Sequence, residues 1–185
     1  AMTSFLSPLS MIVLAFAWAM PAQADFRVEI SGVGVTQIPI AIANFRGEDT
    51  APQKITQIVA ADLERSGQFR STPAGMVIDE VTRPNFEPIR QKPADALLTG
   101  SISRMADGRF DVRFRLWDAV KGEDMGGQSY VVVPADLRLV SHRIADQVYE
   151  KLTGDIGVFS TRIAYVAKQG KRYALKVADA DGFNA

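Results

Sequence analysis

The sequence contains no cysteine, and this absence excludes two kinds of anchoring. Without thiols there can be no disulfide framework, and no lipid can be attached to a cysteine after an export signal. The 185-residue chain must therefore be held together by its interior. Its apolar content of 47% is sufficient for one sizeable hydrophobic core.

Histidine and net charge are also scarce. His142 is the only histidine, so neither a zinc site of the His/Cys type nor a serine–histidine–aspartate triad can be assembled. Basic and acidic residues number 21 each, and this neutrality argues against binding to nucleic acid or to anionic lipid. We therefore expect a non-enzymatic protein with no metal, no cofactor and no small-molecule substrate.

No lysine or arginine precedes the apolar run Phe5–Met20, which is shorter than the roughly 20 residues of a membrane-spanning helix. Ala22 and Ala24 form a small-x-small cleavage motif directly before the charged Asp25. We predict that residues 1–24 are a signal peptide cleaved after Ala24, which places the mature chain in the periplasm. The alternative is an N-terminal membrane anchor. The missing positive charge indicates a start codon assigned too far downstream or an edited sequence.

Two segments near the predicted mature N-terminus have strand patterns. Residues 25–35 alternate apolar and polar side chains, which is typical of a half-buried strand. Residues 38–45 are apolar on both faces, which predicts a central strand with Pro39 at its beginning. Three further strands are predicted at residues 96–104, 110–118 and 125–133. Gly-containing turns lie between them, so we expect an antiparallel meander.

Two amphipathic helices are predicted. The first begins with a capping box at Thr50 and Gln53, with Glu48 and Asp49 adding negative charge at its start, and it ends at Ser66-Gly67. Residues 69–73 then lead into an irregular stretch, 75–93, with a short helix at 85–91. The second helix begins at Pro134 with Asp136 as its cap and ends at Gly154. Its buried stripe is Leu137, Val140, Ile144, Val148 and Leu152.

After the second helix, residues 162–182 read as two strands with a turn, which is the opening of a repeat unit. The expected fold class is α+β, with a mixed sheet of about five strands covered by two main helices. Asp179-Ala180-Asp181-Gly182 resembles the start of a calcium loop but lacks the later ligands, so we interpret it as a hairpin turn of the repeat unit.

The sequence segment RIADQVYEKLTG, followed by TRIAYV, resembles the corresponding segment of the TolB family of periplasmic proteins of the bacterial Tol-Pal system. The resemblance runs from about Phe26 to Asn184. It implies an α+β N-terminal domain at residues 25–156 and a linker with an incomplete β-propeller blade at residues 157–185. A blade needs roughly 40–45 residues, so about half of one blade is expected here.

The resemblance also implies partners. In this family the first dozen or so mature residues bind the C-terminal domain of TolA, and the propeller binds Pal, whose site is therefore expected to be missing here. The family supports outer-membrane invagination and integrity in cell division and is exploited in bacteriocin import. By position, the TolA-binding residues here are Asp25, Phe26, Arg27, Val28, Glu29, Ile30, Ser31, Gly32, Val33, Gly34 and Val35. A β-forming segment at a free end suits addition to the edge of another sheet. The same segment can equally be the first strand of its own domain.

A few residues also permit other functions. His142 lies one turn before Asp146, which permits an acid/base pair, but a solvated contact or a hydrogen bond to a neighbouring loop is the simpler interpretation. A small hydrolase that uses Asp146 and Glu150, which lie one helical turn apart, is a further alternative. Trp117 could anchor a partner or be packed within the domain. The alternative among binding modules is an activator domain of an envelope synthase.

Overall fold

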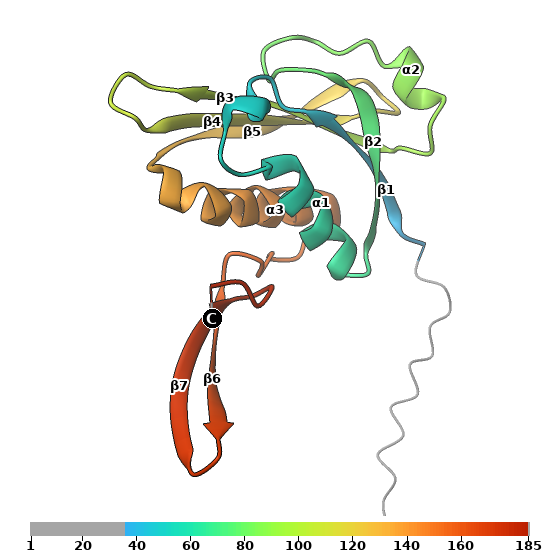
Figure 1. The fold of residues 1–185 in the computed structure, drawn as a ribbon. Helices are drawn as coiled ribbons and strands as arrows, with labels where there is room; N and C mark the ends of the chain where they lie inside the picture. The colour runs from blue at the N-terminus through green and yellow to red at the C-terminus, as the bar shows by residue number, and fades with distance from the viewer. Residues whose placement is uncertain (1–35, 185) are drawn as a thin grey trace, which may run out of the picture. The chain divides into compact units, whose positions relative to one another are not determined.

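The computed structural model describes residues 36–184. They form a five-stranded sheet in the order β2-β1-β3-β4-β5 and a separate two-stranded sheet, β6-β7 (Figure 1). The strands are β1 (Ile38–Asn44), β2 (Phe69–Val77), β3 (Ala96–Arg104), β4 (Phe110–Asp118), β5 (Glu123–Val132), β6 (Arg162–Gln169) and β7 (Arg172–Asp179). The helices are α1 (Ile55–Arg65), α2 (Glu87–Arg90) and α3 (Leu137–Thr153), with short 3-10 turns η1 (Glu48–Thr50) and η2 (Pro134–Asp136).

The five-stranded sheet is mixed, as predicted. β1 runs parallel to both β2 and β3, whereas β3, β4 and β5 form the predicted antiparallel meander. β1 is therefore an interior strand, in agreement with its apolar faces.

The prediction of an irregular chain from residue 75 was wrong, because β2 continues to Val77 and forms one edge of the sheet. Pro73 and Gly75 interrupt the strand pattern, but an edge strand tolerates both, and a shift in the β1–β2 register absorbs the irregularity. The predicted strand at residues 25–35 lies outside the described residues. The count of five strands was right, but β2 is the member that the sequence did not reveal.

The main core lies between one face of the sheet and the helices α1 and α3 (Figure 1). Alternation along β4 places its apolar residues on this face: Phe110, Val112, Phe114 and Leu116. Leu137, Val140, Ile144 and Val148 of α3 are almost completely buried, and Leu152 is partly buried. The predicted helix stripe is confirmed.

The helix ends differ in part from the predictions. Thr50 belongs to η1 and α1 begins only at Ile55, so the predicted capping box was wrong. Instead, the buried carboxylate of Glu48 accepts a hydrogen bond of 2.7 Å from the backbone N–H of Thr56 in the first turn. This contact satisfies a free amide and places negative charge at the helix start. Asp136 makes no side-chain cap, whereas Gly154 ends α3 with a positive φ of 83°, as expected.

The opposite face of the sheet is covered by the segment that contains α2. Trp117 of β4 lies edge-on to Phe86 with 5.9 Å between ring centres, and its Nε1 donates to the Oγ1 of Thr99 at 3.2 Å. Trp117 is 5% exposed, so it is packed within the domain. Between residues 36 and 184, no helix combines the length and hydrophobicity needed to cross a membrane.

Candidate functional site at the helix–hairpin junction

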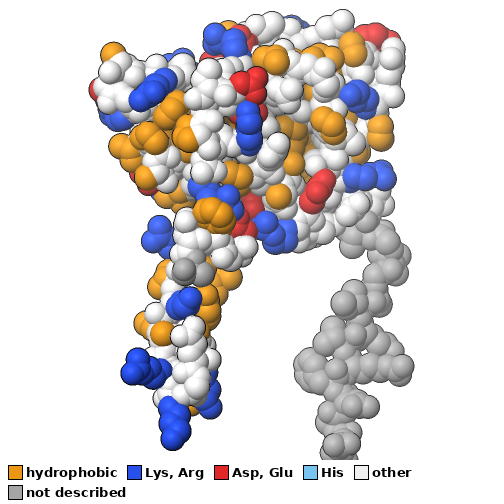
Figure 2. All heavy atoms as spheres, in the orientation of Figure 1, with side chains coloured by type: hydrophobic (Ala, Val, Ile, Leu, Met, Phe, Trp, Pro, Cys, Tyr) orange, Lys and Arg blue, Asp and Glu red, His pale blue; other side chains and the backbone are white. Residues whose placement is uncertain are grey.

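The β6–β7 hairpin exposes apolar side chains that a folded sheet normally buries. Its strands pair in antiparallel register from Arg162–Asp179 to Gln169–Arg172, and Gly170 and Lys171 connect them. Figure 2 shows hydrophobic side chains along the hairpin. The exposed apolar members are Ile163, Tyr165, Val166, Tyr173, Leu175 and Val177. A surface of this kind is typical of an element that packs against further structure.

The linker that leads into β6 is fixed on α3. The carboxylate of Asp146 accepts hydrogen bonds from the backbone N–H groups of Phe159 at 2.6 Å and of Ser160 at 3.1 Å. The ring of Phe159 packs edge-on against Tyr149 with 5.6 Å between ring centres. A Cβ added at Gly157 would lie 2.5 Å from the Cα of Asp146, so only glycine allows this close approach.

The chain returns to α3 directly after β7. Residues 179–183 form a turn in which the N–H of Gly182 donates to the carbonyl of Asp179 at 2.8 Å, and the N–H of Asp179 donates to the carbonyl of Phe183 at 2.9 Å. The N–H of Phe183 also donates to the Oδ1 of Asp181 at 3.0 Å. Asp179–Gly182 is therefore a turn, as predicted, but it follows β7 and does not connect the two strands of this hairpin.

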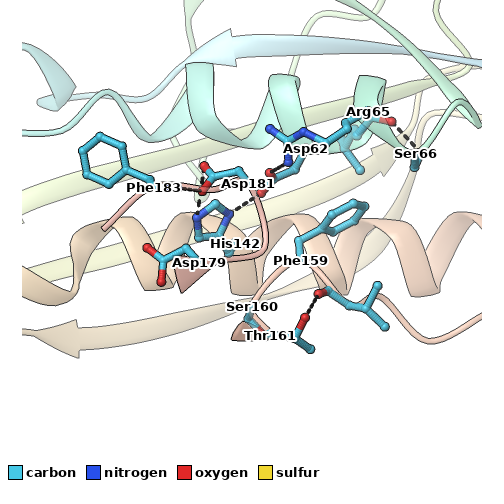
Figure 3. Close-up of polar contacts among 12 residues, drawn as sticks. Asp62, Arg65, Ser66, His142, Phe159, Ser160, Thr161, Asp179, Asp181 and Phe183 are labelled. Carbon is cyan, nitrogen blue, oxygen red and sulfur yellow. Dashed lines mark hydrogen bonds and ion pairs between the residues drawn. The ribbon is translucent and has the colours of Figure 1, made fainter. Parts of the chain in front are cut away.

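This turn places Asp181 beside a buried histidine and aspartate (Figure 3). The Nδ1 of His142 on α3 lies 2.5 Å from the Oδ2 of Asp62 on α1. The Nε2 of His142 lies 3.8 Å from the Oδ2 of Asp181 and has no hydrogen-bond partner within the described chain. His142 is 2% exposed and Asp62 is 1% exposed. The imidazole thus lies between two carboxylates that come from separate parts of the chain.

Two arginines complete the cluster. The Nη1 of Arg65 donates to the Oδ1 of Asp62 at 2.9 Å. Because an ionised carboxylate can only accept hydrogen bonds, the proton between Asp62 and His142 belongs on Nδ1. The Nη2 of Arg138, one helical turn before His142, donates to the Oδ2 of Asp181.

The guanidinium of Arg138 makes two further contacts with the turn. Its Nε lies 3.9 Å from the Oδ2 of Asp179, and its centre lies 4.0 Å above the ring of Phe183. A guanidinium over an aromatic face gains a cation–π attraction in addition to its ion pair. Arg138 therefore contacts three side chains of the turn: those of Asp179, Asp181 and Phe183.

The pKa of the Asp181 carboxyl is lowered from its ordinary value. Burial opposes ionisation of this carboxyl. The hydrogen bond from the Phe183 N–H and the electrostatic interactions with Arg138 and His142 favour ionisation and outweigh burial. The ionised carboxylate is therefore the form that the junction stabilises.

The ligand atoms of Asp62, His142 and Asp181 lie within 4.8 Å of one another, a spacing that could suit a metal ion. The geometry does not favour one. The two carboxylates face different nitrogens of the imidazole, and a single ion cannot bind both nitrogens. The guanidinium of Arg138 already bonds the Asp181 oxygen that a cation would use.

His142 corrects the interpretation drawn from the sequence. It does not lie on a solvated face and does not pair with Asp146, which bonds the linker instead. The option of a hydrogen bond to a neighbouring loop was closer, although the bonded partner, Asp62, lies on another helix. Glu150 is exposed, and with Asp146 bonded to the linker the two carboxylates share no site. The predicted TolA-binding residues and the cleavage motif lie outside the described residues.

Together these features define a two-layer domain of mixed sheet and helices, with a β-hairpin docked on the helical layer. The chain belongs to the TolB amino-terminal domain family, whose family model matches residues 26–125. It is 66% identical over 167 residues, or 90% of this chain, to the Tol-Pal system protein TolB of Albidiferax ferrireducens. It is 62% identical over its whole length to the Tol-Pal system protein TolB of a Polaromonas species, strain JS666.

A solved structure has the same fold. The crystal structure of TolB from Acinetobacter baumannii aligns with a TM-score of 0.68 at 31% identity and covers 79% of this chain. The alignments span 39% and 44% of the two relatives and 37% of the solved chain. The present chain thus corresponds to less than half of the length of the proteins that it matches.

Proposed function

We propose that this chain is part of a non-enzymatic periplasmic adapter of the Tol-Pal envelope system, which binds the C-terminal domain of TolA through residues 25–35. Membership of the TolB amino-terminal domain family is the observation that carries the proposal. The names of the relatives support it, since both are Tol-Pal system proteins. The role in cell division and envelope integrity, and the use of the protein in bacteriocin import, belong to the same proposal.

The position of residues 25–35 supports their assignment as the binding segment. They directly precede β1, the interior strand of the sheet, and their alternating apolar residues can add to the exposed edge of a partner sheet. Gly32 and Gly34 lie within this segment, and glycine permits backbone conformations that other residues avoid.

The arrangement of the polar groups supports a binding role over catalysis. Within residues 36–184, His142 is placed between two carboxylates, and Asp146 holds the linker. Each of these groups has a structural contact that links the helices to the hairpin. We propose that the described domain acts as a carrier for the binding segment and for the structure that follows the hairpin.

Isothermal calorimetry with the purified C-terminal domain of TolA tests the proposal. The mature chain should bind, and a variant that lacks residues 25–35 should show no detectable heat of binding while it keeps the same denaturation midpoint. The control is a variant in which the exposed Lys168 and Lys171 of the hairpin are replaced by serine. Equal affinity of the deletion variant and the mature chain would refute the assignment. We expect the residues of this chain by themselves not to bind Pal.

A further inference from the structure

We propose that Arg138 and His142 of α3 form a carboxylate-binding socket, oriented by Asp62 of α1, and that Asp181 fills it to hold the β6–β7 hairpin in one orientation. The ligand of this site is a carboxylate of the chain itself. This role goes beyond the proposed adapter function and does not depend on it.

The first argument is that the socket presents polar atoms of Arg138 and His142 to the Asp181 carboxylate. The Nε2 of His142 is buried, has no hydrogen-bond partner among residues 36–184 and faces the Asp181 carboxylate at 3.8 Å. A buried polar atom without a partner is costly, and one water bridging the imidazole and the carboxylate would satisfy it in either tautomer of the ring. The Nη2 of Arg138 already donates to the same carboxylate oxygen.

The second argument is that the rest of the cluster orients the socket. Asp62 holds the Nδ1 side of the imidazole, so that the Nε2 side must face the turn. Arg65 in turn bonds Asp62. The same logic applies where a carboxylate orients a functional histidine from its far side. The residues that form and orient the socket all lie on α1 and α3, so the geometry of the socket does not depend on the turn.

The third argument is position. The hairpin is attached to α3 at both of its ends, at the linker through Asp146 and after β7 through Asp181. The linker contact alone fixes one end and would leave the hairpin free to pivot. The Asp181 contact supplies the second point. A cavity of about 470 Å³ borders Arg138 and Asp181, so the turn has open space beside it into which it can move when released.

The experiment uses the Asp181→Ala variant of the whole chain. Because His142 is the only histidine, its imidazole NMR signals can be assigned without ambiguity. The variant should shift these signals and raise the amide exchange rates of residues 179–183 and of the hairpin base about tenfold, the loss expected for one hydrogen bond to a charged group. Exchange in β3 should stay unchanged, which shows that the domain remains folded. The control is Asp155→Ala, an exposed aspartate in the linker.

Added acetate supplies the missing carboxylate. It should move the His142 signals of Asp181→Ala back toward those of the unchanged chain, whereas chloride at equal ionic strength should not. If the His142 signals and the exchange rates of Asp181→Ala match those of Asp155→Ala, the docking role is refuted. If acetate and chloride act alike, the socket is not a carboxylate site.

Discussion

The Oδ2 of Asp62 lies 2.5 Å from the Nδ1 of His142, although 80 positions separate the two residues. This contact joins α1 to α3 beneath the sheet and lies next to the turn that follows β7. It therefore belongs to the packing of the domain and to the placement of the hairpin at the same time.

Asp62→Asn should destabilise the domain by about 3 kcal/mol, since removal of one partner leaves the other charges of a buried pair uncompensated. Chemical denaturation followed by circular dichroism measures this loss as a lower midpoint with an unchanged slope. Asp155→Asn is the matched control, because that aspartate is exposed and should leave the midpoint within error. Equal midpoints for the two variants would show that the Asp62–His142 contact does not contribute to stability.

The low pKa of Asp181 predicts how docking of the turn depends on pH. Because folding lowers this pKa, the ionised carboxylate stabilises the docked state once the pH is above its ordinary value near 3.8. That contribution is lost as the pH falls through the lower pKa of the docked state. Amide exchange of residues 179–183 should therefore differ between the unchanged chain and Asp181→Asn at neutral pH, and the difference should shrink in acid. A difference that grows as the pH falls would contradict this.

Gly157→Ala should loosen the linker, because the new Cβ would meet the backbone of Asp146 at 2.5 Å. We expect faster amide exchange at Phe159 and Ser160, whose N–H groups donate to Asp146. Val158→Ala, at an exposed position of the same linker, is the control. If both variants leave these two amides equally protected, the close approach at Gly157 is not needed.

The core stripe of α3 predicts a graded series of stabilities. Ile144→Ala should cost about 2–5 kcal/mol because Ile144 is completely buried in the main core. Leu152→Ala should cost less, since Leu152 is only partly buried near the helix end. Denaturation of both variants in parallel measures the order, and a larger loss at Leu152 would place the core elsewhere.

Local patterns in the sequence predicted most of the fold. The period of the α3 stripe, the alternation along β4 and the turn glycines each depend on neighbouring residues, and the structure confirms them. β2 was missed because Pro73 and Gly75 obscure a strand whose pairing with β1 compensates for them. The helix start at Thr50 was misjudged because the contact that serves α1 comes from Glu48, eight positions before its donor Thr56.

The junction could not be predicted from periodicity. Asp62, His142 and Asp181 are distant in sequence, and each alone has the pattern of an ordinary surface residue on a helix or turn. One local signal was present: Arg138 and His142 are spaced by four, so both side chains leave α3 on the same face. Which carboxylates meet that face depends on how α1 and the turn pack, and this is decided only in three dimensions.

The proposed adapter role is tested most directly by NMR titration of the isotope-labelled mature chain with the C-terminal domain of TolA. The account predicts that signals of residues 25–35 change most, with small effects at the start of β1 and none in the His142 imidazole. Large changes centred on α1, α3 or the hairpin, with residues 25–35 unaffected, would contradict it.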